Sequence, residues 1–186
     1  HPEYISTKLA REWNEETLAV QHHEAHIASC RLENQVSGQA LGISWDGTGY
    51  GTDGTIWGGE FFISEDDACR HIGQMRQFPL PGGDEAIKEP RRSALGLLYE
   101  IEGNGLFSNG RIPEHWFSQN EIAVLQQMLQ KNMNCPRTSS VGRLFDAVAA
   151  ILSLQLKINY EGQAAMALEF VADPSETGFY DIEVLV

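Results

Sequence analysis

A glycine- and aspartate-rich segment between two apolar stretches constrains the fold of this chain more than any other feature. Residues 40–45 (ALGISW) predict one strand, Ile56 to Ile63 predict a second, and Asp46 to Gly54 between them predict the turn. No G-K-[ST] follows the glycines, so the segment is not a Walker loop. The glycine run leads into a strand and not a helix, which excludes a Rossmann fingerprint. What remains is an ordinary hairpin, or a strand–turn–strand unit whose backbone N–H groups approach a phosphate.

The rest of the chain predicts a mixture of helices and strands. Helices are expected over residues 5–16, 22–29, 89–102, 119–133, 139–155 and 162–172, and further strands over 18–20, 71–78 and 179–186. The second of these helices is expected to pack through Ala25, Ile27 and Ala28. Ser139 and Ser140 can cap the helix that follows them. Because the last expected strand stays apolar to the end, we expect a fragment of a longer protein with an incomplete sheet.

Charge and composition exclude several classes of function. Asp and Glu outnumber Lys and Arg by 26 to 13, and the net charge of −13 repels phosphate backbones and anionic lipids. We therefore expect no nucleic-acid and no membrane partner, and no apolar run reaches the roughly 20 residues of a membrane helix. Cys30, Cys69 and Cys135 include no C-x-x-C pair, which is typical of the reducing cytoplasm. Each is interpreted as a packed or surface residue and not as a nucleophile.

Two histidines four residues apart, His22 and His26, form a candidate metal-binding pair. On a helix they lie one turn apart on one face, where two imidazoles can reach one cation. Two ligands are too few for a tight site, so a carboxylate should join them. Asp46, directly after the first strand, can coordinate a cation or position a water. The alternative is a histidine-rich helix start at the surface. The H-E-x-x-H pattern of zinc peptidases is not met, because His23 and not Glu follows His22.

Two further groups of charged residues are candidates for ligand binding. Lys88, Arg91 and Arg92 stand out in so acidic a chain and can receive an anion such as a phosphate. The alternative is a helix start whose charges pair locally. Asp146 lies within the apolar helix from Val141 to Leu154 and needs a partner, for which a ribose diol is suited. The alternative here is an aspartate on the helix surface.

These motifs occur together and in one order. The series VQHHEAH, SWDGTGYGTDGTIWGGEF, FPLPGGDEAIKEPRRSA, GRLFDAVAA and YEGQAA closely resembles the HypF family, the carbamoyltransferases of nickel–iron hydrogenase maturation. The resemblance covers essentially the whole chain and falls on the C-terminal transferase region of that family, which is similar to the tRNA threonylcarbamoyl-transferases. It implies an α/β fold of the actin/Hsp70-like ATPase (RNase H-like) class, incomplete in a fragment. Residues 1–38 would then end a first lobe that carries the histidine motif. Residues 39–186 would form a second lobe with the nucleotide-binding strand–turn–strand, a helical insertion and a truncated C-terminal sheet.

The resemblance also assigns roles to individual residues. It implies a divalent metal (iron, zinc or magnesium) at His22, His26 and Asp46, with a further Asp ligand expected beyond Val186. It implies that ATP or carbamoyl adenylate contacts Gly47, Thr48 and Gly49 through its phosphates and Asp146 and Gly162 through its nucleoside. Catalytic roles are implied for Asp46, Lys88, Arg91 and Arg92, the last three in a stretch peculiar to HypF-type proteins.

The reaction that the resemblance implies has two stages. Carbamoyl phosphate and ATP give carbamoyl adenylate in upstream domains, and this region passes the carbamoyl group to the C-terminal cysteine of a HypE-type partner. The fragment alone is then expected to be inactive. Three alternatives stay open: an antibiotic-type O-carbamoyltransferase, an actin-like sugar kinase or ATPase, and a non-catalytic piece that only docks a partner. The KEPRR and PLPGG stretches favour the HypF type, and a kinase has no use for the two histidines.

Overall fold

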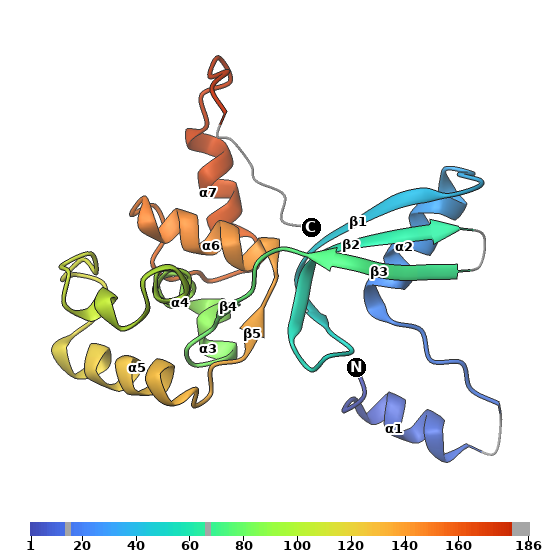
Figure 1. The fold of residues 1–186 in the computed structure, drawn as a ribbon, viewed down its shortest axis with the longest axis horizontal. Coiled ribbons are helices and arrows are strands. Elements are labelled where there is room, and N and C mark those ends of the chain that lie inside the picture. The colour runs from blue at the N-terminus through green and yellow to red at the C-terminus, as the bar shows by residue number, and fades with distance from the viewer. Residues whose placement is uncertain (14–15, 66–67, 180–186) are drawn as a thin grey trace.

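The antiparallel hairpin expected from the glycine-rich segment forms the centre of the fold. The computed structural model describes residues 1–13, 16–65 and 68–179. Strand β1 (Ala40–Tyr50) pairs antiparallel with β2 (Ile56–Glu65), which pairs antiparallel with β3 (Ala68–Gln74). At its first residue β2 also pairs parallel with β5 (Arg137–Thr138), and β5 pairs antiparallel with β4 (Phe78–Pro79). Figure 1 shows the long strands on one side and the short ones beside the helices.

Helices lie on both sides of this sheet (Figure 1). Helix α2 (His22–Glu33) lies beside the long strands, and α1 (Ile5–Glu12) lies below and apart from them. The opposite side holds α3 (Asp84–Lys88), α4 (Pro90–Glu102), the 3-10 helix η1 (Gly103–Phe107), α5 (Gln119–Lys131), α6 (Val141–Ile151) and α7 (Gln163–Val171). Local sequence explains where two of them begin. Ser118 and Glu121 form a capping box at α5, and the Ser140 hydroxyl accepts a hydrogen bond from the backbone N–H of Arg143 at α6, as predicted.

Each of the two sides has an apolar cluster of its own. The larger cluster lies among η1, α4, α5 and α6 and includes Leu95, Leu106, Trp116, Leu125 and Ala147. Each large side chain buried in this way stabilises the fold by roughly 1.5–3 kcal/mol. On the other side, Ile27 of α2 packs with Trp57 and Phe62 of β2. Gly42 of β1 leaves the space for Ile27, because a Cβ at Gly42 would lie 2.8 Å from its Cδ1. This contact seats α2 against the strands.

The hairpin itself differs from the prediction in one respect that matters for the site. The segment from Asp46 to Gly49 is not part of the turn, since β1 continues to Tyr50 and the turn begins at Gly51. The β1–β2 register is interrupted between Trp45 and Gly49, which identifies a bulge. The glycines at positions 47 and 49 therefore lie in a bulge within the strand and not in the turn.

Other sequence-based predictions also need correction. The segment 18–20 is not a strand, and its Leu18 and Val20 side chains are exposed. Helix α2 is buried through His23 and Ile27, whereas Ala25 and Ala28 are exposed. The strand expected over 71–78 is divided between β3 and β4. Of the strand expected at the end of the chain, all but Phe179 lies outside the described residues.

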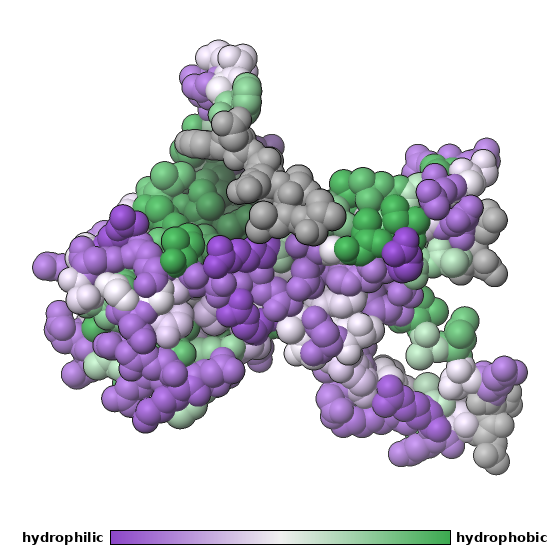
Figure 2. All heavy atoms as spheres, in the orientation of Figure 1, coloured by the Kyte–Doolittle hydropathy of each residue, from purple (hydrophilic) through white to green (hydrophobic). Residues whose placement is uncertain are grey.

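The face shown in Figure 2 is mainly hydrophilic and includes apolar areas. One lies over α6 and α7, where Leu152, Phe170 and Val171 are exposed. Another lies on the outer face of β1, where Leu41 and Trp45 are exposed. No helix among the described residues is both long and apolar enough to cross a bilayer.

Candidate metal centre and nucleotide site

Helix α2 places His22 and His26 on one face and is anchored to the strand opposite. The side-chain oxygen of Gln21 caps the helix by accepting hydrogen bonds from the N–H groups of its second and third residues, at 2.6 and 3.0 Å. The Gln21 amide nitrogen donates to the carbonyl oxygen of Tyr50 at the end of β1, at 2.9 Å. One side chain therefore fixes the start of the helix that carries both histidines relative to the strand that carries Asp46.

Asp46 reaches the histidines from the bulge of β1. Trp45 pairs with Gly59 and Gly49 with Trp57, so the three residues between Trp45 and Gly49 face only Gly58. The Asp46 Oδ1 atom accepts a hydrogen bond from the next backbone N–H at 2.6 Å. This bond leaves Oδ2 directed at α2.

The structure brings His22, His26 and Asp46 together, as the sequence predicted. Asp46 Oδ2 lies 2.9 Å from His22 Nε2, and His22 Nε2 lies 3.1 Å from His26 Nε2. One ligand atom from each of the three falls within 4.8 Å of the others. Ligands at 2.0–2.1 Å from one metal are about 2.9 Å apart at octahedral and about 3.3 Å apart at tetrahedral corners. Two nitrogens and one oxygen at this spacing therefore fit a divalent metal with open positions, although metal binding itself stays a prediction.

The charges at the cluster suit cation binding. Burial opposes ionisation of Asp46, but hydrogen bonds from His22 and from the backbone N–H of Gly47 hold its pKa below the usual value. Burial, together with the neighbouring His22, lowers the pKa of His23. A carboxylate that is ionised at neutral pH is in the form that binds a divalent metal.

His23 is a residue that the sequence analysis did not assign to the site. Its side chain is fully buried, its Nε2 has no hydrogen-bond partner among the described residues, and this atom lies 3.8 Å from Asp46 Oδ2. The ring lies against Gly49, where a Cβ would be 2.7 Å from Nε2 and closer still to Cε1. Gly49, predicted to approach a phosphate, thus makes room for a histidine in this structure. The doubled histidine was the available signal, because adjacent helical residues point to different faces.

The start of α6 supports the bulge from the other side. The Ser140 hydroxyl lies 2.8 Å from the carbonyl oxygens of both Asp46 and Gly47 and bonds to them. Gly142 packs so closely that a Cβ there would lie 2.7 Å from the Cα of Gly47. Thr48, the third predicted phosphate contact, is exposed. The predicted phosphate-facing segment therefore lies at a helix N-terminus, which favours anions.

Asp146 has a protein partner that the sequence analysis missed. Its carboxylate is buried on α6, 3.0 Å from Nη1 of Arg143, which is buried as well. Burial raises the pKa of Asp146 to about 6, against the opposing effect of Arg143. The spacing of three residues on one helix was the signal for this pair. Gly162 adopts a left-handed conformation (φ 78°) at the start of α7. The nucleoside contacts predicted for Asp146 and Gly162 stay predictions.

The three cations of the KEPRR stretch are paired within the chain. Lys88 pairs with Glu85 at 3.0 Å. Arg91 is buried and pairs with Glu89 at 2.9 Å, and Arg92 pairs with the same carboxylate at 2.5 Å. The structure therefore gives these residues the local pairing that was the alternative interpretation. A catalytic role for them stays a prediction without a supporting contact.

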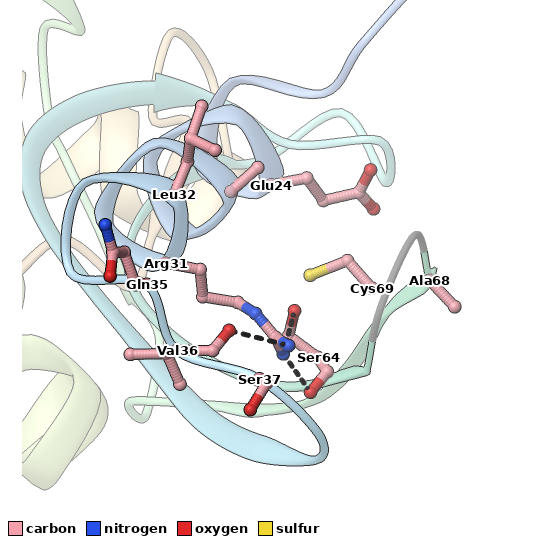
Figure 3. Close-up of a pocket in the computed structure, with 10 residues that line it drawn as sticks. Glu24, Arg31, Leu32, Gln35, Val36, Ser37, Ser64, Ala68 and Cys69 are labelled. Carbon is pink, nitrogen blue, oxygen red and sulfur yellow. Dashed lines mark hydrogen bonds between the residues drawn. The ribbon is translucent and has the colours of Figure 1, made fainter.

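Two cavities flank α2. A groove of about 550 Å³ between α2 and β1 is lined by His26 and Asp46 and so reaches the ligand cluster. The second, of about 500 Å³, lies toward the C-terminal end of α2 (Figure 3). There the two terminal nitrogens of Arg31 donate to Ser64 and to the carbonyl oxygens of Val36 and Gly38. Arg31 thus fastens α2 to the sheet.

Comparison with known proteins identifies the family. Residues 42–185 match the model described as "Carbamoyltransferase, Kae1-like Domain, second subdomain", and residues 1–33 match the "HypF Kae1-like domain". The chain is 42% identical to carbamoyltransferase HypF2 of Cupriavidus necator over 93% of its own length and 21% of that protein. It is 40% identical to the probable carbamoyltransferase HypF of Methanocaldococcus jannaschii, over 93% of this chain and 23% of the relative. The chain therefore spans about a fifth of the length of these relatives.

Solved structures agree with this result. A crystal structure of full-length HypF in a phosphate- and nucleotide-bound form matches 100% of this chain and 29% of its own, with a TM-score of 0.87 and 37% identity. T. kodakarensis HypF matches 95% of this chain and 25% of its own, with a TM-score of 0.81 and 35% identity. The mixed α/β fold predicted from the sequence is thus that of the Kae1-like part of HypF, consistent with part of an actin-like ATPase fold. The chain belongs to the HypF carbamoyltransferase family.

Proposed function

We propose that this chain forms the metal-binding transfer site of a carbamoyltransferase. In the full-length protein, upstream domains make carbamoyl adenylate from carbamoyl phosphate and ATP. The site described above then passes the carbamoyl group to the C-terminal cysteine thiolate of a HypE-type protein. The observation that carries this proposal is the convergence of His22, His26 and Asp46 in a chain whose relatives are named carbamoyltransferases.

The residues of the chain divide the work between binding and orientation. His22, His26 and Asp46 would hold a divalent metal, which acts when bound as a Lewis acid toward the carbamoyl or phosphate oxygen. The bulge glycines and the start of α6 would hold the adenylate phosphate, and Asp146 would hold the ribose once its pair with Arg143 opens. Fixing the leaving group and the acceptor at one place lowers the entropy cost of the transfer.

Two of the three cysteines of the chain are poorly suited to act as the acceptor thiol. Burial and the nearby Glu24 raise the pKa of the Cys69 thiol, and burial raises the pKa of Cys135. Both are thereby disfavoured as thiolates, which are the nucleophilic form. Neither of these two thiols is therefore suited to the role that the proposal gives to a cysteine of the partner.

The metal assignment is tested by single substitutions in the full-length protein. His22→Ala, His26→Ala and Asp46→Ala should each lose the bound metal and the carbamoylation of the partner's cysteine. His115→Ala is the matched control, because His115 is exposed and lies outside the cluster. Metal content is measured by elemental analysis, and transfer by mass spectrometry of the acceptor. Full metal content and transfer in the Asp46 variant would contradict the proposal.

A further substitution separates the metal site from the nucleotide site. Asp146→Asn should weaken nucleotide binding by about 10- to 100-fold, which corresponds to the loss of about one hydrogen bond to a charged group. It should leave the metal in place. If Asp146→Asn loses the metal and Asp46→Ala keeps it, the two residues have the opposite roles.

A further inference from the structure

A carboxylate is buried in the middle of the central strand, away from the metal ligands. Glu60 of β2 is fully buried. Its Oε2 lies 2.7 Å from Nε2 of His71, in hydrogen-bond contact. Its Oε1 accepts a hydrogen bond from the hydroxyl of Ser139, and longer ones of 3.3 and 3.4 Å from the backbone N–H groups of Gly58 and Gly59. Every oxygen of this carboxylate is therefore engaged.

Burying a carboxylate in the interior of a sheet costs free energy, because the group loses its hydration. A buried carboxylate stays compatible with folding only if it is paired and fully hydrogen-bonded. Among the described residues its ionisable partner is His71 of β3, and no lysine or arginine pairs with it. An apolar residue would fill a buried strand position at lower cost. The contacts of Glu60 should therefore serve a geometry that an apolar side chain cannot maintain.

The contacts of Glu60 fall where the β1–β2 ladder is interrupted. Gly58 is the residue of β2 that faces the bulge of β1, and a Cβ on Gly58 would strike the carbonyl oxygen of Asp46. Glu60 Oε1 binds the N–H groups of Gly58 and Gly59 at this point. It thus holds the strand segment that lies directly behind Asp46.

The same carboxylate oxygen also reaches the segment on the other side of the bulge. It accepts the hydroxyl hydrogen bond of Ser139, and the next residue, Ser140, bonds the carbonyl oxygens of Asp46 and Gly47. Glu60 therefore joins the two segments between which the bulge is held, namely the backbone of β2 and the start of α6. It touches neither the cluster nor the predicted nucleotide contacts.

We propose that Glu60 is a positioning residue that holds the β1 bulge and so presents Asp46 to the metal, with His71 as its paired group. The proposal rests on the metal site of the proposed function. It assigns Glu60 no contact with substrate and no proton transfer.

The test compares two substitutions of Glu60 in the full-length protein. Glu60→Gln keeps an acceptor toward the glycine N–H groups and Ser139, and its amide can donate to His71. It should keep the absorption spectrum of bound cobalt(II) and change cobalt affinity by less than about threefold. Glu60→Leu removes all of these bonds and should weaken cobalt binding by about 10- to 100-fold, the usual effect of losing a group that orients a ligand. Its residual complex should show an altered spectrum.

A matched control separates positioning from loss of stability. Leu106→Ala makes a cavity in the helical cluster and destabilises the protein without touching the bulge. It should leave the cobalt spectrum unchanged. Hydrogen exchange is measured in parallel on the amides of residues 46–49 and 58–59, which should exchange faster in Glu60→Leu and in the milder Ser139→Ala, but not in Leu106→Ala.

Cobalt binding by the wild-type protein tests the proposed metal site, and hydrogen exchange at the bulge tests the positioning role of Glu60. If the wild-type protein binds no cobalt, the proposed metal site fails, and exchange at the bulge still decides whether Glu60 holds it. Unchanged exchange in Glu60→Leu, or an unchanged cobalt spectrum in that variant, would overturn the positioning role.

Discussion

At the scale of single residues, the contact between Gly49 and His23 carries a direct prediction. Because the His23 ring is fully buried, it cannot turn away from a side chain placed at Gly49. Gly49→Ala should therefore destabilise the protein by about 1–3 kcal/mol through overpacking. It should also weaken metal binding, since the ring lies beside Asp46. The urea midpoint and the metal affinity are the two measurements.

The control for this prediction is a glycine with free space around it. Gly73 of β3 has no atom within 4 Å of the position that a Cβ would take. Gly73→Ala should leave metal binding unchanged and leave the urea midpoint unchanged or slightly raised. Equal effects at Gly49 and Gly73 would mean that strand glycines matter generally, and that the contact with His23 does not.

At the scale of elements, Glu89, which lies between α3 and α4, joins the start of α4 to the segment that follows α6. Its carboxylate pairs with Arg91 and Arg92 in the first turn of α4 and with Lys157 after α6, at 2.5–2.9 Å. Burial opposes ionisation, but the hydrogen bonds from these three cations lower the pKa of Glu89 to about 2. The KEPRR stretch therefore stabilises the junction of α3, α4 and the chain after α6.

This pKa predicts how stability changes with pH. The folded pKa lies below the unfolded value of 4.5, so the ionised carboxylate stabilises the fold fully above pH 4.5. That contribution, on the order of 3 kcal/mol, is lost as the pH falls from 4.5 towards 2. Glu89→Gln should lower the free energy of unfolding at pH 7 and flatten its acid dependence. Glu85→Gln is the control, because an exposed pair with Lys88 contributes little. Equal acid dependence in the wild type and Glu89→Gln would contradict this role.

The elements also show what the sequence can and cannot predict. The helix expected over 119–133 is found at Gln119–Lys131, because its period and its capping box are local signals. The H-x-x-x-H spacing on α2 is local in the same way, and it led to two members of the metal cluster. The bulge of β1 was missed, since it depends on β2 and on the start of α6, which are distant in the sequence.

Buried polar residues were the least predictable part of the site. Glu60, His23 and Arg143 are all buried and all contact groups near the bulge. A strand or helix pattern marks such positions as inward-facing, but it does not say which polar group will find a partner there. Their roles become visible only when the elements that supply the partners are placed in space.

At the scale of the whole molecule, the candidate site lies where the two sides of the chain meet. Helix α2 and β1 supply the candidate metal ligands, and α6, on the other side of the sheet, packs against the same bulge (Figure 1). The proposed metal and phosphate sites would thus both adjoin one short segment, residues 46–49. A substitution at either site that moves this segment should therefore change ligand binding at the other site, as expected for linked binding sites.

The last prediction concerns the activity of residues 1–186 on their own. Making carbamoyl adenylate requires carbamoyl phosphate and ATP, both strongly anionic, to be held together. This chain carries a net charge of −13, and the cations of its KEPRR stretch are paired with carboxylates of the chain. The negative electrostatic potential of the chain therefore opposes the binding of two anionic substrates. Purified residues 1–186 should bind cobalt(II) or zinc at His22, His26 and Asp46 without releasing AMP or pyrophosphate from carbamoyl phosphate and ATP, while the full-length protein does so under the same conditions. Robust turnover by residues 1–186 would mean that this chain itself makes carbamoyl adenylate. It would refute the proposal that upstream domains of the full-length protein do so.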